Sequence, residues 1–251
     1  MLKPTPENKQ AKPSNTTLGW YLYFCLYRLF LQYLPSEYSS DQLHAVDYDL
    51  TVSPISTKNS HEFSKKEICD SILSKLGEST FEEYKNNAKK WFHNHKSFII
   101  TMNNVFSVQN GMSVLGIDKE IPIISVIEMQ WWQTVLRRTV LLSLFFSTRL
   151  IDLKYVLLVT WVLLMLLGGS EPEKPQVLKF MMWHYGVETS IFWDDSPSEI
   201  KRMREQCTQV TSVKIPRPNK KDANDHTKPG MFSYDTFELY TEELKRNWKD
   251  N

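Results

Sequence analysis

The chain has 251 residues, a formal net charge of +1 and 41% hydrophobic residues. This length is enough to bury a real core, and the balanced charge argues against a nucleic-acid partner. Eight glycines and a mean hydropathy of −0.39 exclude a polytopic transporter and leave room for one or two membrane segments at most.

The N-terminal region contains two segments of different character. Residues 1–17 are polar and include three prolines, which predicts a flexible tail. Residues 18–34, LGWYLYFCLYRLFLQYL, are rich in aromatic side chains, which favour the boundary between membrane and water. Two interpretations remain open for 18–34: an interfacial or anchor helix, and an amphipathic helix packed on a core.

Residues 35–60 are polar and rich in serine, and we interpret them as a linker. Within this segment His44, Asp47 and Asp49 form a potential metal-binding group. Nothing in the local pattern holds the three side chains on one rigid face, so a solvated acidic loop is the favoured interpretation and no metal site is assigned.

Residues 61–127 are expected to form a small α+β unit that begins with a helical hairpin. Ser64 followed by Glu67 predicts a capping box, and Gly77 predicts the end of that helix. Thr80 with Glu83 predicts the start of a second helix. Its expected apolar face contains Phe81, Tyr84, Ala88, Trp91 and His95.

The second half of this unit has the composition of strands. Residues 97–127 are rich in β-branched and aromatic side chains, and Asn110-Gly111 lies between two apolar runs. Such a dipeptide predicts a β-hairpin, hence a small antiparallel sheet. Pro122 limits the run that follows it to an edge strand or an extended approach.

Residues 128–169 contain most of the aliphatic hydrophobicity. Tyr155 to Gly169 is apolar on every face of a helix, and its roughly fifteen residues span about 22 Å, against about 30 Å for the hydrocarbon core of a bilayer. Three structures remain open: a single tilted span, a re-entrant hairpin, and a buried helix of a soluble domain. The aromatic and basic residues before the run resemble an interfacial collar. The predicted membrane-contacting residues are Trp131, Trp132, Arg137, Arg138, Tyr155, Trp161, Leu164 and Leu167.

Residues 170–251 are expected to form a helical region with a polar loop. Ser196-Pro197-Ser198-Glu199 is typical of a helix start, and a short strand is expected near residue 210. A terminal amphipathic helix is predicted to begin after a cap at Ser233. Its apolar stripe is a weak candidate for binding a partner through Phe237, Tyr240, Leu244 and Trp248.

Catalytic and cofactor motifs are absent from the sequence. There is no P-loop, dinucleotide fingerprint, nucleophile elbow or zinc-protease motif. Adjacent acidic pairs such as Asp194-Asp195 point apart on a regular element and are not expected to form a dyad, and His93 and His95 lie on different faces of a helix. We therefore assign no catalytic, cofactor-binding or metal-binding residue.

Together these patterns predict a mainly α protein with a small antiparallel β element, an α+β class, and a central apolar helix embedded in a membrane. The function expected from them is that of a non-catalytic, membrane-anchored accessory or tethering subunit. Its partners would be membrane lipid and other protein subunits, at the endoplasmic reticulum or a mitochondrial membrane. The alternative is a soluble cytoplasmic α+β domain in which Tyr155 to Gly169 is a core helix and an enzymatic or binding cleft is present. The three scattered cysteines, Cys25, Cys69 and Cys207, favour a reducing compartment.

Overall fold

The computed structural model describes residues 42–57, 63–117, 121–131, 134, 173–218 and 228–249. Of residues 247–249 it describes the backbone only. All of these except Thr134 belong to one of the two units into which the chain divides, namely residues 33–132 together with 172–251.

The centre of this unit is a five-stranded parallel sheet with strand order β3-β2-β1-β4-β5. The strands are β1 (Gln42–Val46), β2 (Ser97–Thr101), β3 (Ile123–Ser125), β4 (Thr189–Asp194) and β5 (Val210–Lys214). Their short runs of apolar residues are almost entirely buried, as is typical of parallel strands covered on both faces.

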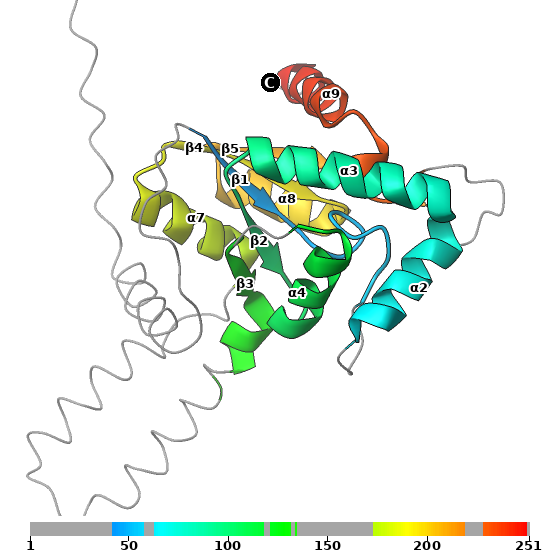
Figure 1. Ribbon diagram of the computed structural model, residues 1–251. Coiled ribbons are helices and arrows are strands. Elements are labelled where there is room, and N and C mark those ends of the chain that lie inside the picture. Colours follow the sequence, from blue (N-terminus) through cyan, green and yellow to red (C-terminus); the bar gives the residue numbers. More distant parts are fainter. Residues whose placement is uncertain are drawn as a thin grey trace, which may run out of the picture. The chain divides into compact units, whose positions relative to one another are not determined.

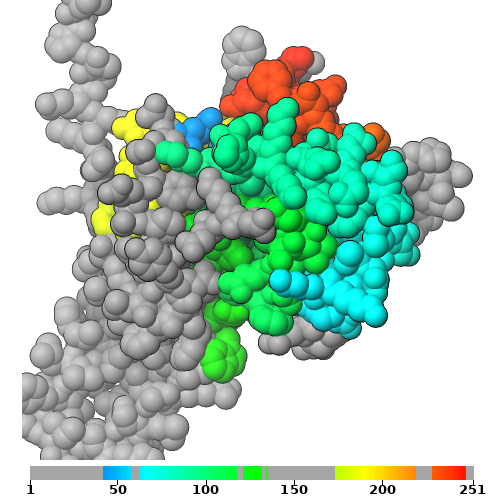
Figure 2. All heavy atoms as spheres, in the orientation of Figure 1, coloured from blue at the N-terminus to red at the C-terminus, as the bar shows by residue number. Residues whose placement is uncertain are grey.

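Helices connect the strands, because parallel neighbours require crossovers. They are α2 (Lys65–Leu76), α3 (Glu78–Asn94), α4 (Val105–Val114), α7 (Lys174–Tyr185), α8 (Pro197–Gln206) and, after the short helix η1 (Met231–Ser233), α9 (Thr236–Lys249). In Figure 1, α3 crosses in front of the sheet and α8 lies behind it. Figure 2 shows α2, α3 and α4 together on the front face, with α9 along its upper edge.

The core lies on both faces of the sheet. On one face Val46, Ile99 and Trp193 join one buried cluster with Phe81 and Trp91 of α3. Alternate strand residues point to the opposite face. These strand residues are buried as well: Leu43, Ala45, Phe98 and Phe192. So are the inward residues of α7 and α8, namely Val177, Leu178, Met181, Ile200 and Met203.

The predicted fold class, mainly α with a small antiparallel β element, is wrong: the protein has a five-stranded parallel sheet with helices, an α/β arrangement. The predicted hairpin at Asn110-Gly111 is part of helix α4. The Asn104 side chain caps this helix by accepting a hydrogen bond from the Ser107 N–H at 2.7 Å. Gly111 has a packing role there, because a Cβ at this position would meet the Tyr48 hydroxyl.

Strand β1, the middle strand of the sheet, lies within the segment that was expected to be a polar linker, residues 35–60. Strands β2 and β3 extend this same sheet. The run after Pro122 forms β3 at the edge of the sheet, so of the two predicted alternatives the edge strand is present.

Several local helix predictions are confirmed. The capping box joins Ser64 and Glu67, whose carboxylate accepts the Ser64 N–H at 2.8 Å. Gly77 has a φ of 74° between α2 and α3, and α8 begins at Pro197 after Ser196. The last helix begins at Thr236, after Asp235 rather than Ser233. There the Asp235 carboxylate accepts the N–H of Phe237 at 2.9 Å.

Within the part of the chain that is described, no helix has the length and apolarity needed to cross a bilayer. The predicted tail, residues 1–17, the aromatic segment, residues 18–34, and Tyr155 to Gly169 lie outside the described residues.

Candidate active site

Two aspartates end neighbouring strands at the middle of the sheet. Asp47 follows β1 directly, and Asp194 is the last residue of β4. The chain runs from β1 towards β2 and β3 on one side and continues in β4 and β5 on the other, so the β1–β4 pair is the point where the strand order reverses. In open α/β sheets ligands bind beyond the carboxyl ends of the strands at this switch point.

Asp195 completes a cluster of three carboxylates. One oxygen from each of Asp47, Asp194 and Asp195 lies within 4.8 Å of the others. All three residues are buried, with exposed fractions of 4%, 0% and 3%. Such a spacing allows one cation to contact all three side chains.

Lys174 lies between two of these carboxylates. Its ammonium donates to Asp47 Oδ1 and to Asp194 Oδ2, each at 2.6 Å. Lys174 is the first residue of α7, whose start is held by a capping box between Glu173 and Gln176. Local sequence therefore places a lysine that is only 3% exposed against the ends of β1 and β4.

Burial and the charges of the neighbouring side chains together set the pKa values of this group. Burial raises the pKa of Asp47 well above its usual range; the charge of Lys174 opposes this rise, and the charges of Asp194 and Asp49 add to it. Burial would lower the pKa of Lys174, but the charges of Asp194 and Asp47 outweigh it and raise that pKa. Lys174 is therefore an ammonium, and the carboxylates around it compete for positive charge.

Arg217 holds the third carboxylate, that of Asp195. Its Nε donates to Asp195 Oδ2 at 2.5 Å, and its Nη2 pairs with the same oxygen. Burial and the charge of Asp194 raise the pKa of Asp195, and Arg217 counteracts them. Arg217 itself is about half exposed, so it forms the outer rim of the site.

The loop after β1 carries a second aspartate and an unusual backbone conformation. Leu50 has a φ of 60°, a left-handed conformation that is uncommon for a residue other than glycine. It lies between Asp49, whose Oδ1 accepts the N–H of Thr57 at 2.6 Å, and Thr51, whose hydroxyl accepts the N–H of Asp195 at 3.1 Å. Backbone strain of this kind clusters at functional sites.

The end of β2 provides polar groups on the other side of β1. Thr101, its last residue, is fully buried, and its hydroxyl accepts the N–H of Asn103 at 3.0 Å. The Asn103 side chain donates to the Thr57 hydroxyl at 2.5 Å, and Thr57 in turn donates to Asp49. Thr101 and Asp49 are thus joined through one hydrogen-bond network.

No protein-family model, curated protein or solved structure matches this chain. The chemistry of the site therefore rests on its geometry.

The interpretation of Asp47 and Asp49 as a solvated acidic loop is wrong, because both are buried with exposed fractions of 4%. His44 does not join them. Its Nδ1 accepts the indole N–H of Trp193 at 3.2 Å, and burial together with the nearby charge of His95 lowers its pKa to about 4. His44 is therefore a neutral core residue beneath the site.

The expectation that Asp194 and Asp195 point apart, and so do not act together in one site, is also wrong. The pair lies where β4 ends and the chain turns into α8, so regular strand alternation no longer applies. Both carboxylates reach the same cluster as Asp47.

The site residues that sequence reasoning missed are Asp47, Asp49, Thr101, Lys174, Asp194, Asp195 and Arg217. One available signal was that Asp-x-Asp directly follows the run Leu43–Val46, which is apolar except for His44, and Asp-Asp follows Ile191–Trp193 in the same way. Acidic residues that end two buried strands are expected to meet at one edge of a parallel sheet. No comparable signal marked Lys174 or Arg217.

The residues predicted to contact membrane or partner stay predictions. Trp131 is 58% exposed and belongs to a helical segment of which residues 126–131 and 134 are described. Phe237 and Leu244 are 73% and 41% exposed, whereas Tyr240 packs against the core. The remaining predicted side chains lie outside the described residues: Trp132, Arg137, Arg138, Tyr155, Trp161, Leu164, Leu167 and Trp248.

Proposed function

We propose that this chain is an enzyme that transfers phosphoryl groups with the help of a divalent cation, and specifically that it hydrolyses phosphate monoesters. The observation that supports this most strongly is the convergence of Asp47, Asp194 and Asp195 around the ammonium of Lys174 at the switch point of the sheet.

The charge balance supports a cation. Among the described residues, the three clustered carboxylates of Asp47, Asp194 and Asp195 outnumber the two cations that pair with them, Lys174 and Arg217. This leaves an excess of negative charge in a largely buried site, which is costly unless a proton or a divalent cation offsets it. A donor set of carboxylate oxygens favours Mg²⁺ or Mn²⁺ over softer metals.

The same residues suit a phosphate substrate. Protein sites for Mg²⁺ commonly combine one or two carboxylates with oxygens of the substrate phosphate. The Lys174 ammonium stabilises charge that develops on the phosphoryl oxygens. Thr101 accepts a hydrogen bond from Asn103, and its own hydroxyl proton is directed to a phosphate oxygen in this proposal.

Asp47 is the best candidate nucleophile. Among the described residues only Lys174 donates to its carboxylate, at Oδ1, whereas both oxygens of Asp194 accept hydrogen bonds, from Lys174 and from the Ser196 N–H. Attack by Asp47 on phosphorus forms an acyl phosphate and breaks the phosphorus–oxygen bond to the leaving group. Asp49, two residues further on, donates a proton to the leaving oxygen. Water then attacks the acyl phosphate, gives a proton to Asp49, and releases inorganic phosphate and Asp47.

Hydrolysis of p-nitrophenyl phosphate in the presence of Mg²⁺ tests this proposal. The full chain is expected to release p-nitrophenol, and Asp47→Asn to lower kcat by roughly 10³-fold or more, because an amide does not replace the nucleophile. The control is Asp70→Asn, which changes an exposed aspartate on α2 in the same way. Equal rates for Asp47→Asn and the control would rule out the proposed role of Asp47. The tethering function predicted from the sequence stays a separate prediction.

A further inference from the structure

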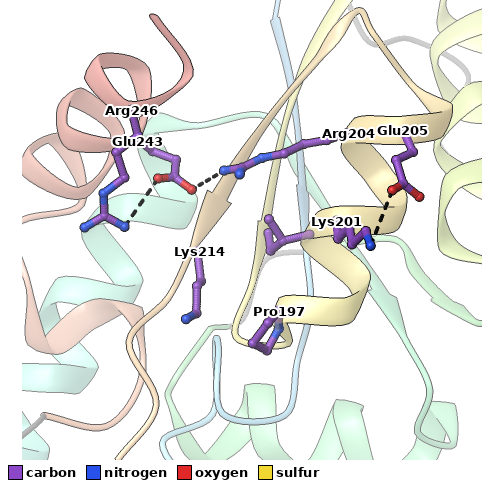
Figure 3. Close-up of a pocket in the computed structure, with 8 residues that line it drawn as sticks. Pro197, Lys201, Arg204, Glu205, Lys214, Glu243 and Arg246 are labelled. Carbon is purple, nitrogen blue, oxygen red and sulfur yellow. Dashed lines mark hydrogen bonds and ion pairs between the residues drawn. The ribbon is translucent and has the colours of Figure 1, made fainter. Parts of the chain in front are cut away.

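A groove opens beside the candidate active site, between α8, the end of β5 and α9 (Figure 3). Its volume is about 410 Å³, which is within the usual range for small-molecule sites. Ile200, only 4% exposed, and Pro197 give it an apolar lining. Four basic side chains, those of Lys201, Arg204, Lys214 and Arg246, also line it.

Among the described residues, the groove has a positive charge that its acidic side chains do not cancel, because four basic residues but only two acidic ones, Glu205 and Glu243, line it. Glu243 is buried and pairs with Arg204 and Arg246, which fixes α9 against α8 (Figure 3). Lys201 lies 3.8 Å from Glu205, but both side chains are more than 60% exposed, and such pairs contribute little.

Lys214 is the cation available to a ligand. Within the described parts of the chain, no acidic side chain forms an ion pair with it, although it lines the groove. Figure 3 shows its side chain beside Pro197 and separate from the Arg204–Glu243–Arg246 group.

The groove begins one strand away from the carboxylate cluster. Lys214, the last residue of β5, is the register partner of Asp194, the last residue of β4. Neighbouring strands are about 4.8 Å apart, and register partners in a parallel pair point to the same face of the sheet. A ligand bound at Asp194 therefore reaches Lys214 with a second group a few ångströms further along.

We propose that this groove binds a second phosphate of the substrate, so that the preferred substrates are small organic bisphosphates such as nucleoside 3′,5′-bisphosphates. This inference rests on the proposed function. One phosphate occupies the site at Asp47 and Lys174, the other accepts charge-assisted hydrogen bonds from Lys214 and Lys201, and Ile200 and Pro197 pack against the organic part.

Calorimetric titration of the Asp47→Asn variant with Mg²⁺ present tests this, because that variant does not turn over the ligand. Adenosine 3′,5′-bisphosphate is expected to bind at least about tenfold more tightly than adenosine 5′-monophosphate. Lys214→Glu in the same background is expected to remove most of this preference. Lys90→Glu, a matched change of an exposed lysine on α3, is expected to leave it unchanged.

A second measurement uses the otherwise unaltered chain: adenosine 3′,5′-bisphosphate is expected to inhibit p-nitrophenyl phosphate hydrolysis at lower concentrations than the monophosphate, and Lys214→Glu is expected to abolish this difference. Equal affinity for the two nucleotides, or a preference that survives Lys214→Glu, overturns the inference. Phosphatase activity without the preference leaves the proposed function standing and refutes the groove alone. A Lys214-dependent preference in a chain without phosphatase activity supports the groove and refutes the proposed function.

Discussion

The ammonium of Lys174 lies 2.6 Å from the carboxylate of Asp47, although the two residues are 127 positions apart in the sequence. Both side chains are almost completely buried, at 3% and 6% exposed. A buried ion pair of this kind is rarely retained for stability alone, since apolar residues of similar volume often stabilise a core as well or better. The pair therefore points to chemistry at the ends of β1 and β4.

Removal of the lysine is expected to destabilise the protein severely. Lys174→Met leaves Asp47 and Asp194 buried without their shared cation, which costs about 3–5 kcal/mol of unfolding free energy. The cost is expected to shrink at acidic pH, because Asp47, whose pKa is raised by burial, then takes up a proton. Urea unfolding at two pH values measures both effects.

The control for this prediction is Lys179→Met, which removes an exposed lysine from the same helix, α7. Its cost is expected to stay within about 0.5 kcal/mol. If the two variants lose similar stability, Lys174 is not compensating the buried carboxylates.

Binding of Mg²⁺ is expected to depend on pH in a defined direction. The pKa values of Asp47 and Asp195 are raised by burial, so without metal each contributes stability below its ordinary pKa and loses it as the pH rises through the raised value. A divalent cation binds the deprotonated forms, so the increase in Tm caused by Mg²⁺ is expected to be larger at pH 8 than at pH 5. Thermal unfolding with Mg²⁺ or EDTA measures this. An increase that is the same at both pH values contradicts the prediction.

Arg217 is expected to act as a positioning residue through Asp195. Because its guanidinium lowers the pKa of Asp195 against the effect of burial, Arg217→Met should move the acid limb of the pH–rate profile to higher pH. Arg217→Lys retains the charge without the paired contact, so its acid limb should lie between those of Arg217→Met and the unaltered chain. A profile that keeps its acid limb in Arg217→Met, with only a uniform loss of rate, indicates a purely structural role.

The side chain of Tyr48, which lies between Asp47 and Asp49 in the sequence, is expected to leave room only for glycine at position 111. A Cβ at position 111 would be 1.4 Å from the Tyr48 hydroxyl oxygen and 2.6 Å from Cζ, so Gly111→Ala should cost roughly 1–3 kcal/mol. Tyr48→Phe removes the closest atom and should recover part of that cost. Urea unfolding of both single variants and the double variant measures the coupling, and simply additive losses would show that the two residues do not clash.

Local helix signals were predictable because their determinants lie within a few residues. The hydroxyl of Ser64 and the carboxylate of Glu67 satisfy each other across one turn, and Pro197 fits the first turn of α8. Asn110-Gly111 misled for the opposite reason: it has the composition of a turn, but a distant contact with Tyr48 and the cap at Asn104 decide in favour of a helix.

The sheet could not be predicted from the same signals. β1 has only five residues and no alternation, and its register depends on partners such as Ser97 and Ile191, which lie far along the chain. The site has the same origin: Asp47, Lys174 and Asp194 meet only when the parallel strands are in order. The aspartates that follow two short runs were a visible part of this pattern. A strand buried on both faces shows no alternation of polar and apolar residues, so these runs were not recognised as strands, and Asp47 and Asp49 were interpreted as part of a loop.

The most direct test of the central claim is a Mg²⁺ titration of the initial rate of p-nitrophenyl phosphate hydrolysis by the full chain and by Asp195→Asn. The site of Asp47, Asp194 and Asp195 predicts no hydrolysis in EDTA, a saturable increase with Mg²⁺, and a higher half-saturating Mg²⁺ concentration for Asp195→Asn. Hydrolysis that is undiminished in EDTA, or a half-saturating concentration that Asp195→Asn leaves unchanged, would contradict a divalent cation held by these three carboxylates.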